Sequence, residues 1–164
     1  MPKDAVLTWD TDNQICRWSF ENNDIKADSS LLTSVMVSLF TDARASSEDI
    51  LPDTKSTDRR GWWGDELNSD LLTDKIGSKL WLLERSKGTE DIIVKAKLYI
   101  QEALKWMITE GIANEVKVET EAQRTRDAGT IILAFQVKIL KPDGVTDTFR
   151  FNKEWEDTAN GEQI

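Results

Sequence analysis

Any catalysis by this chain would depend on carboxylates, because its 164 residues include no histidine. The lack of an imidazole excludes Ser-His-Asp and Cys-His mechanisms. Glycosidases instead use two Asp or Glu side chains about 5–10 Å apart, one of them with a raised pKa. Glu84 follows the apolar run Trp81–Leu83, and Asp65 and Glu66 follow a pair of tryptophans. Among 30 acidic residues such placements arise by chance, so we expect no catalytic residue and predict that the chain is not an enzyme.

The chain also lacks the ligand patterns of metal and phosphate sites. Its one cysteine, Cys16, alternates with apolar residues and is expected to be a small core side chain. Asp70 and Asp74 do not have EF-hand spacing, and no cluster of cysteine and histidine exists. The sequence Gly61-x-x-Gly64 lacks the lysine of a phosphate-binding loop. We therefore expect no metal and no cofactor.

Composition bounds the class of protein. With 39% apolar and 31% charged residues the chain has the balance of a soluble globular domain. Its net charge of −9 argues against binding nucleic acid, which requires clustered Lys and Arg. No apolar run approaches the length of a membrane-spanning helix. The N-terminus, Met1–Asp4, lacks the apolar core of a signal peptide, so we expect the chain to stay in the compartment where it is made.

The segment Asp58–Asp65 is the most distinctive part of the chain. It contains Arg59, Arg60, Trp62 and Trp63, with a glycine on each side of the tryptophans. Two glycines in four residues disfavour a helix or a central strand. Burying an aromatic side chain is worth roughly 2–3 kcal/mol, so the segment is expected to be an ordered loop in which arginines stack on indoles and aspartates hold the guanidinium groups. Two interpretations remain open: a clamp that pins the loop to its own domain, or a loop that packs on a partner protein.

Hydrophobic periodicity outlines an α+β fold with two to three helices between two β regions. A long irregular segment is expected at residues 42–76, and the second half of the first helix has a strand as its alternative. A β-hairpin is expected over residues 5–26: Leu7 and Trp9 alternate before a turn at Asp10–Asn13, Cys16, Trp18 and Phe20 alternate on the return strand, and Glu21–Asp24 is a second turn. The other elements expected before the C-terminal sheet are a helix from about Leu31 to Phe40 capped by Asp28, Ser29 or Ser30, a short helix within Gly77–Arg85, and a long amphipathic helix from about Glu90 to Glu110 ended by Gly111.

The C-terminal third is predicted to be an antiparallel β-meander. Ile131–Ile139 alternates between apolar and other residues, Pro142–Gly144 forms a turn, and Val145, Phe149 and Phe151 lie on the returning strand. Nothing after this strand covers its edge, because the acidic tail is expected to be disordered until it binds a partner. An exposed edge can accept a strand from another chain through backbone hydrogen bonds.

A chain of this length fits one domain. We expect that domain to span residues 1–151, with a flexible acidic tail at 152–164. Within the domain, residues 1–27 form the hairpin, 28–111 the helices and the Trp-rich loop, and 112–151 the antiparallel sheet.

Three sequence blocks carry a resemblance to a known family. They are Ser38–Ala45 (SLFTDARA), Asp58–Asp65 (DRRGWWGD) and Gly77–Arg85 (GSKLWLLER). Their order resembles the baseplate proteins of Mu-like contractile-tailed phages, over roughly residues 1–140. That family is similar to the small wedge protein of T-even phages that starts the tail sheath. The T-even relatives carry Glu-Pro-Arg after the long helix, whereas this chain has Gly111–Glu115 there, so the role of that arginine does not transfer.

The resemblance implies a structural subunit of a contractile-tail baseplate, made in the host bacterial cytoplasm and located in the virion. About six copies would form a ring, contact other wedge proteins, the tail sheath protein and the tail tube or hub, and initiate the sheath by strand pairing. The alternatives are a carboxylate-dependent hydrolase of cell-wall glycan and an acidic cytoplasmic adaptor. The residues expected to bind partners are Arg59, Arg60, Trp62, Trp63, Trp81, Val145, Phe149 and Phe151.

Overall fold

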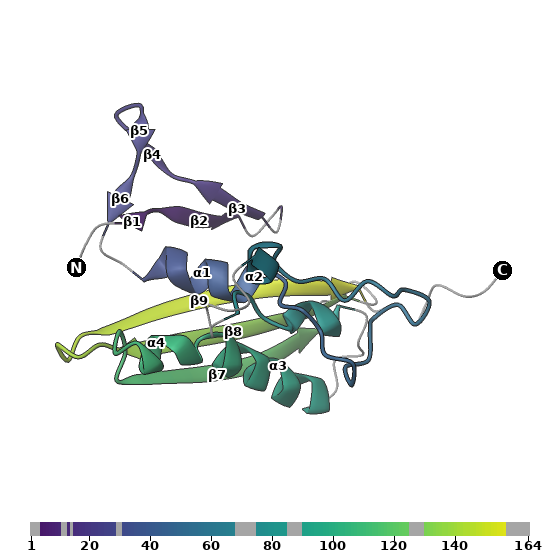
Figure 1. Ribbon diagram of the computed structural model, residues 1–164. Helices are drawn as coiled ribbons and strands as arrows, with labels where there is room; N and C mark the ends of the chain where they lie inside the picture. The colour runs from purple at the N-terminus through teal and green to yellow at the C-terminus, as the bar shows by residue number, and fades with distance from the viewer. Residues whose placement is uncertain are drawn as a thin grey trace.

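The computed structural model describes residues 4–10, 13, 15–28, 31–67, 75–84, 90–124 and 130–156. A group of short N-terminal strands stands beside a layer of helices that covers a three-stranded antiparallel sheet, so the predicted α+β class is confirmed (Figure 1). The elements are β1 Asp4–Ala5, β2 Leu7–Asp10, β3 Ile15–Trp18, β4 Phe20–Glu21, β5 Asp24–Ile25, β6 Ala27–Asp28, α1 Leu32–Phe40, α2 Gly64–Leu67, the 3-10 helix η1 Leu80–Leu83, α3 Glu90–Ala103, α4 Lys105–Thr109, β7 Glu115–Arg124, β8 Thr130–Leu140 and β9 Thr146–Glu156.

The sheet has the strand order β7-β8-β9. Alternate residues of β8 are buried, and these residues are Leu133, Phe135, Val137 and Ile139. The predicted turn joins β8 to β9, with Gly144 at φ 84° and its N–H donating to the Lys141 carbonyl. β9 extends to Glu156, beyond residue 151, because Thr130–Ile132 of β8 continue the antiparallel pairing. Residues 157–164, the rest of the expected tail, lie outside the described residues.

Two consecutive helices pack on the buried face of the sheet. Ala96 and Ile100 of α3 and Met107 of α4 are buried, as the apolar spacing predicted. The expected long helix divides at Leu104, because the Met107 N–H bonds to the Leu104 carbonyl only three residues back and tightens the turn. Gly111 ends α4 with φ 68°, the conformation that favours glycine at a helix C-terminus. No helix among the described residues is both long and apolar enough to span a membrane.

Helix α1 lies on the same core and also holds the N-terminal strands. The predicted helix is confirmed, with Val35, Met36 and Leu39 buried. Leu31 occupies the N-cap position and offers no side-chain hydrogen bond. The expected caps, Ser29, Ser30 and the side chain of Asp28, lie outside the described residues. The Thr33 hydroxyl donates to the Ala5 carbonyl at 2.5 Å and accepts from the Leu7 N–H at 3.2 Å.

The N-terminal strands form three two-stranded ladders: β1 with β6, β2 with β3 and β4 with β5. The predicted pairing of Leu7 and Trp9 with the return strand is confirmed, since Leu7 is opposite Trp18 and Trp9 is opposite Cys16. The prediction that Cys16 is a core residue is wrong, because Cys16 is exposed. Among the side chains of this region that the structure describes, those of Val6 and Leu7 at the base of the hairpin are buried.

Candidate functional site

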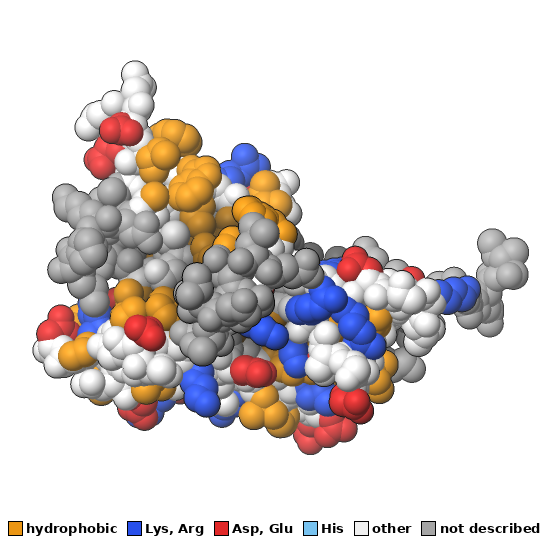
Figure 2. Space-filling model, in the orientation of Figure 1, with side chains coloured by type: hydrophobic (Ala, Val, Ile, Leu, Met, Phe, Trp, Pro, Cys, Tyr) orange, Lys and Arg blue, Asp and Glu red, His pale blue; other side chains and the backbone are white. Residues whose placement is uncertain are grey.

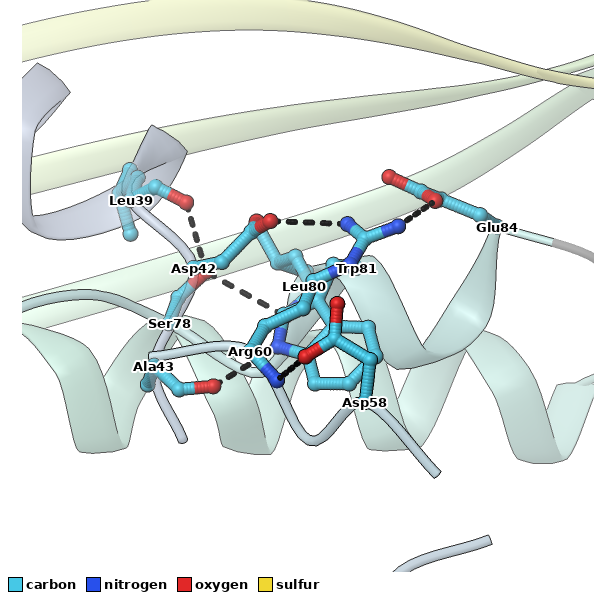
Figure 3. Close-up of polar contacts among 9 residues, drawn as sticks. All are labelled: Leu39, Asp42, Ala43, Asp58, Arg60, Ser78, Leu80, Trp81 and Glu84. Carbon is cyan, nitrogen blue, oxygen red and sulfur yellow. Dashed lines mark hydrogen bonds and ion pairs between the residues drawn. The ribbon is translucent and has the colours of Figure 1, made fainter. Parts of the chain in front are cut away.

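Most of the residues that the structure describes between α1 and α3 are irregular, and Ser78 anchors this segment to the core. The Ser78 Oγ–H donates to the Leu39 carbonyl at 2.6 Å, at the end of α1 (Figure 3). The Ser78 backbone bonds to Thr41 at 2.9 Å and to Ala43 at 3.0 Å. Gly77 permits this approach, because it has φ 110° and a Cβ there would lie 2.6 Å from the Thr41 carbonyl oxygen.

The Arg60 side chain joins three parts of the chain that are distant in sequence: its own loop, Asp42 after α1, and η1 with its C-cap Glu84. Its guanidinium lies over the Trp81 ring, 4.6 Å from the centroid, and contacts Asp42 at 2.8 Å and Glu84 at 3.3 Å (Figure 3). Trp81 is 2% exposed, and its indole N–H donates to the Ala43 carbonyl at 2.8 Å. We call Asp42, Arg60, Trp81 and Glu84 the Arg60 clamp. The predicted stacking of an arginine on an indole occurs, but on Trp81 instead of the neighbouring tryptophan pair.

The backbone around Arg60 is turned sharply to reach the clamp. Arg60 has φ 47°, an uncommon conformation for a residue other than glycine. The Asp58 carboxylate accepts the Arg60 N–H at 2.8 Å and so stabilises this turn. Gly61 follows with φ 115°, where a Cβ would lie 2.9 Å from the Arg44 Cβ.

Arg59 fixes the preceding loop through backbone carbonyls. Its guanidinium donates to the carbonyls of Ser46, Ser47 and Asp49, and its own carbonyl accepts the Ala45 N–H at 2.9 Å. Arg59 and Arg60 thus hold the loop to its own domain, which is the first of the two interpretations of this segment.

Asp49 and Lys79 form a partly buried ion pair at 2.8 Å that closes the same loop onto η1. Burial pushes the pKa of Asp49 upward, but hydrogen bonds from Lys79 and Ser46 outweigh it and leave the pKa below its ordinary value. The hydrogen bond to Asp49 raises the pKa of Lys79.

The two tryptophans have different environments. The Trp62 ring is half-buried and lies over Gly64, where a Cβ would fall 2.2 Å from ring atoms. The Trp63 ring is 5.5 Å from that of Trp62 and is 70% exposed. Trp62 therefore belongs to the loop's own packing, whereas Trp63 leaves most of its surface available.

The remaining residues expected to bind partners are mostly internal. Phe151 is buried, Phe149 packs partly buried against the core, and Trp81 is enclosed in the clamp. Val145 is exposed in the turn before β9. The side chains of Trp81, Phe149 and Phe151 therefore stabilise the domain in this structure.

The edge of β9 that faces away from β8 presents a row of backbone N–H and C=O groups. The Lys141 N–H donates to the Val145 carbonyl at 2.9 Å. Along an antiparallel ladder, pairs of residues that hydrogen-bond to each other alternate with pairs whose backbone groups point away from each other. The Leu140 carbonyl, one residue before Lys141, accordingly points away from β9 and accepts the Asn114 N–H at 2.7 Å. Among the described strands β9 pairs with β8 alone. The residues whose backbone groups point to the open edge include Thr146, Thr148, Arg150 and Asn152.

Two of the carboxylates considered for catalysis, Glu84 and Asp65, make structural contacts. Glu84 is paired with Arg60 and lines a cavity of about 250 Å³ with Trp81. Asp65 accepts the Ile76 N–H at 3.3 Å, and the side chain of Glu66 lies outside the described residues. Within the described part of the chain, no group of three or more His, Cys, Asp or Glu residues is placed to hold a metal ion. Glu84 and Asp65 therefore contribute an ion pair and a backbone hydrogen bond to the packing of this segment.

The Arg60→Ala variant tests the clamp. We expect the free energy of unfolding to fall by about 1–2 kcal/mol, because a partly exposed cation–π contact and two screened ion pairs are lost. Urea denaturation of the variant and of Lys55→Ala, an exposed lysine in the same loop, provides the comparison. An equal effect of the two substitutions would contradict a stabilising role for Arg60.

The Asp49–Lys79 pair predicts a pH dependence. Because the pKa of Asp49 is lowered in the folded state, its contribution is present above 3.8 and is lost as the pH falls through the folded pKa. Because the pKa of Lys79 is raised, its contribution is complete below 10.5 and is lost as the pH rises through the folded pKa. The stability difference between the wild type and Lys79→Met, from urea denaturation, should be largest between these limits. A difference that does not change with pH would rule out this contribution.

Comparison with known proteins identifies the family. The family model described as phage protein GP46 matches residues 31–146, which include the Arg60 clamp, α3, β7 and β8. The baseplate protein gp46 of Escherichia phage Mu is 48% identical over 98 residues, covering 60% of this chain and 64% of the Mu protein, which is less than two thirds of that relative's length. The Mu-like prophage FluMu protein gp46 of Haemophilus influenzae is 32% identical over 152 residues, covering 93% of this chain and 97% of that protein. This chain belongs to the phage protein GP46 family.

Proposed function

We propose that this chain is a non-enzymatic structural subunit of a phage tail baseplate and therefore part of the virion. The support is its family and the Mu relative, which is named a baseplate protein. The clamp and ion pairs of the described residues serve packing, which suits a structural role.

The open edge of β9 supports a more specific role for the chain, the docking of the tail sheath. β9 is 11 residues long, whereas strands of about five or six residues are usual. It contains no proline, and its edge offers the backbone groups of Thr146, Thr148, Arg150 and Asn152. Natural sheets normally shorten, cover or interrupt such an edge, because it templates pairing with another chain.

We infer that β9 accepts one strand from the tail sheath protein and so starts sheath assembly in a contractile tail. Each backbone hydrogen bond adds about 0.5–1.5 kcal/mol, and alternate side chains supply selectivity. We further propose that the chain resembles the T-even wedge protein in its place in the tail. About six copies would form a ring and contact other wedge proteins and the tail tube or hub. A ring can close through unlike patches on neighbouring subunits.

Trp63 supports a second contact within the same assembly. Its ring is held against Trp62 on an ordered loop yet remains 70% exposed. Tryptophan side chains of this kind often contribute most of the binding energy of an interface. We therefore place Trp63 against another baseplate protein.

The Thr148→Pro variant tests the β9 edge. Proline removes an N–H that points away from β8, so the unfolding free energy should change by about 1 kcal/mol or less while strand addition is blocked. Thr148→Val, which keeps the N–H, is the matched control. In cells that lack the wild-type chain, electron microscopy should show finished baseplates with naked tubes for Thr148→Pro and full sheaths for Thr148→Val. Full sheaths on Thr148→Pro baseplates would exclude docking at this edge.

The two tryptophans should separate stability from assembly. Trp62→Ala should lower the free energy of unfolding by roughly 1–3 kcal/mol, since it removes half-buried packing, whereas Trp63→Ala should change it by about 0.5 kcal/mol or less. Trp63→Ala should nevertheless reduce the amount of the chain in purified particles about tenfold. Quantitative mass spectrometry of particles measures this amount. A normal amount of Trp63→Ala in particles would show that Trp63 does not bind a baseplate partner.

A further inference from the structure

The N-terminal arm, defined here as the described residues of 4–28, exposes several large apolar side chains. The exposed fractions are 69% for Phe20, 52% for Trp18, 47% for Ile25 and 44% for Ile15. Figure 1 shows the arm standing away from the sheet, and Figure 2 shows hydrophobic side chains gathered over it. Apolar side chains grouped on a small projecting element indicate an interaction surface.

The arm is held in place by backbone hydrogen bonds. Val6, Ser19 and Lys26 form a closed ring at the junction of the three ladders: the Val6 N–H donates to Lys26 at 2.7 Å, the Lys26 N–H to Ser19 at 2.8 Å and the Ser19 N–H to Val6 at 2.9 Å. Thr33 of α1 bonds to both sides of this junction. An arm fixed in this way loses little conformational freedom when it binds.

The outer end of the arm, β4 and β5 with their turn, has two chemically different faces. Asn22 and Asn23 have φ 52° and 64°, as a two-residue type I′ hairpin requires. Phe20 pairs with Ile25, so both side chains lie on one face. Glu21 is opposite Asp24 on the other face, where two like charges destabilise the hairpin.

We propose that this hairpin end inserts into a groove of a different baseplate protein. The groove has an apolar floor that covers Phe20 and Ile25, and a Lys or Arg that contacts Glu21 and Asp24. A cation there would relieve the repulsion between the two exposed carboxylates. A second copy of this chain is a poorer match, because the chain has a net charge of −9 and would bring further acid to an acidic hairpin. The inference rests on the proposed baseplate role for the assembly that contains the partner.

The test supplies full-length variants to cells that make all other tail proteins but lack this chain. Phe20→Glu and the double variant Glu21→Lys/Asp24→Lys alter the two faces separately. Ile50→Glu is the control, since Ile50 is 84% exposed and lies outside the arm. We expect each arm variant to reduce the chain in purified particles at least about tenfold, and Ile50→Glu to leave it unchanged. Quantitative mass spectrometry measures the amount, and circular dichroism with urea denaturation checks that each variant is folded.

The outcomes separate this inference from the proposed function. Wild-type levels of both arm variants, or equal loss of the Ile50→Glu variant, would overturn the docking role of the arm. Absence of the wild-type chain from particles would overturn the baseplate role itself.

Thr148→Pro should remain in particles at the wild-type level, because its defect concerns only the sheath. If sedimentation shows that the wild type self-associates and Phe20→Glu does not, the occupant is a second copy and the inference fails. Should Phe20→Glu not fold, the double charge variant, which replaces only exposed side chains, decides the test.

Discussion

Burial of one face of a three-stranded sheet is the constraint on which the rest of this structure depends. Alternate residues of β8, such as Val137 and Ile139, point to the core, and Ile100 and Met107 cover them. Because the strand period is two, this fixes which residues face solvent and which backbone groups reach the open edge of β9. The same core receives α1, which carries the N-terminal arm through Thr33.

The irregular segment is ordered because its polar contacts converge on a buried anchor. Ser78 ties it to the end of α1, and Trp81 beside it provides the surface on which Arg60 lies. The ion pairs of Arg60 are partly exposed and individually weak. The loop is held in position because the same guanidinium group also lies on the buried indole of Trp81. This order leaves Trp63 on the surface of a fixed loop, where an interface residue would need to be.

Local patterns predicted the elements better than they predicted their contacts. The spacing of apolar residues gave α3, and the Pro142–Gly144 turn was readable from its residue types. The break of the helix at Leu104 could not be predicted from the sequence, because the residues on both sides are good helix formers and give no sign of the change in hydrogen bonding. Arg60 was expected to stack on a neighbouring indole, but its ring partner is Trp81, which only tertiary folding brings near. Exposure of Cys16 was missed for a related reason, since alternation in a hairpin does not reveal whether another layer covers it.

A cryo-electron microscopy map of the assembled tail, at a resolution that separates neighbouring strands, tests the central claim most directly. We expect a strand from the sheath protein about 4.8 Å from β9, with its backbone bonded to Thr146, Thr148, Arg150 and Asn152. A map in which the chain occupies the baseplate while this edge faces solvent, or is covered by side chains alone, would contradict strand addition as the way the sheath begins.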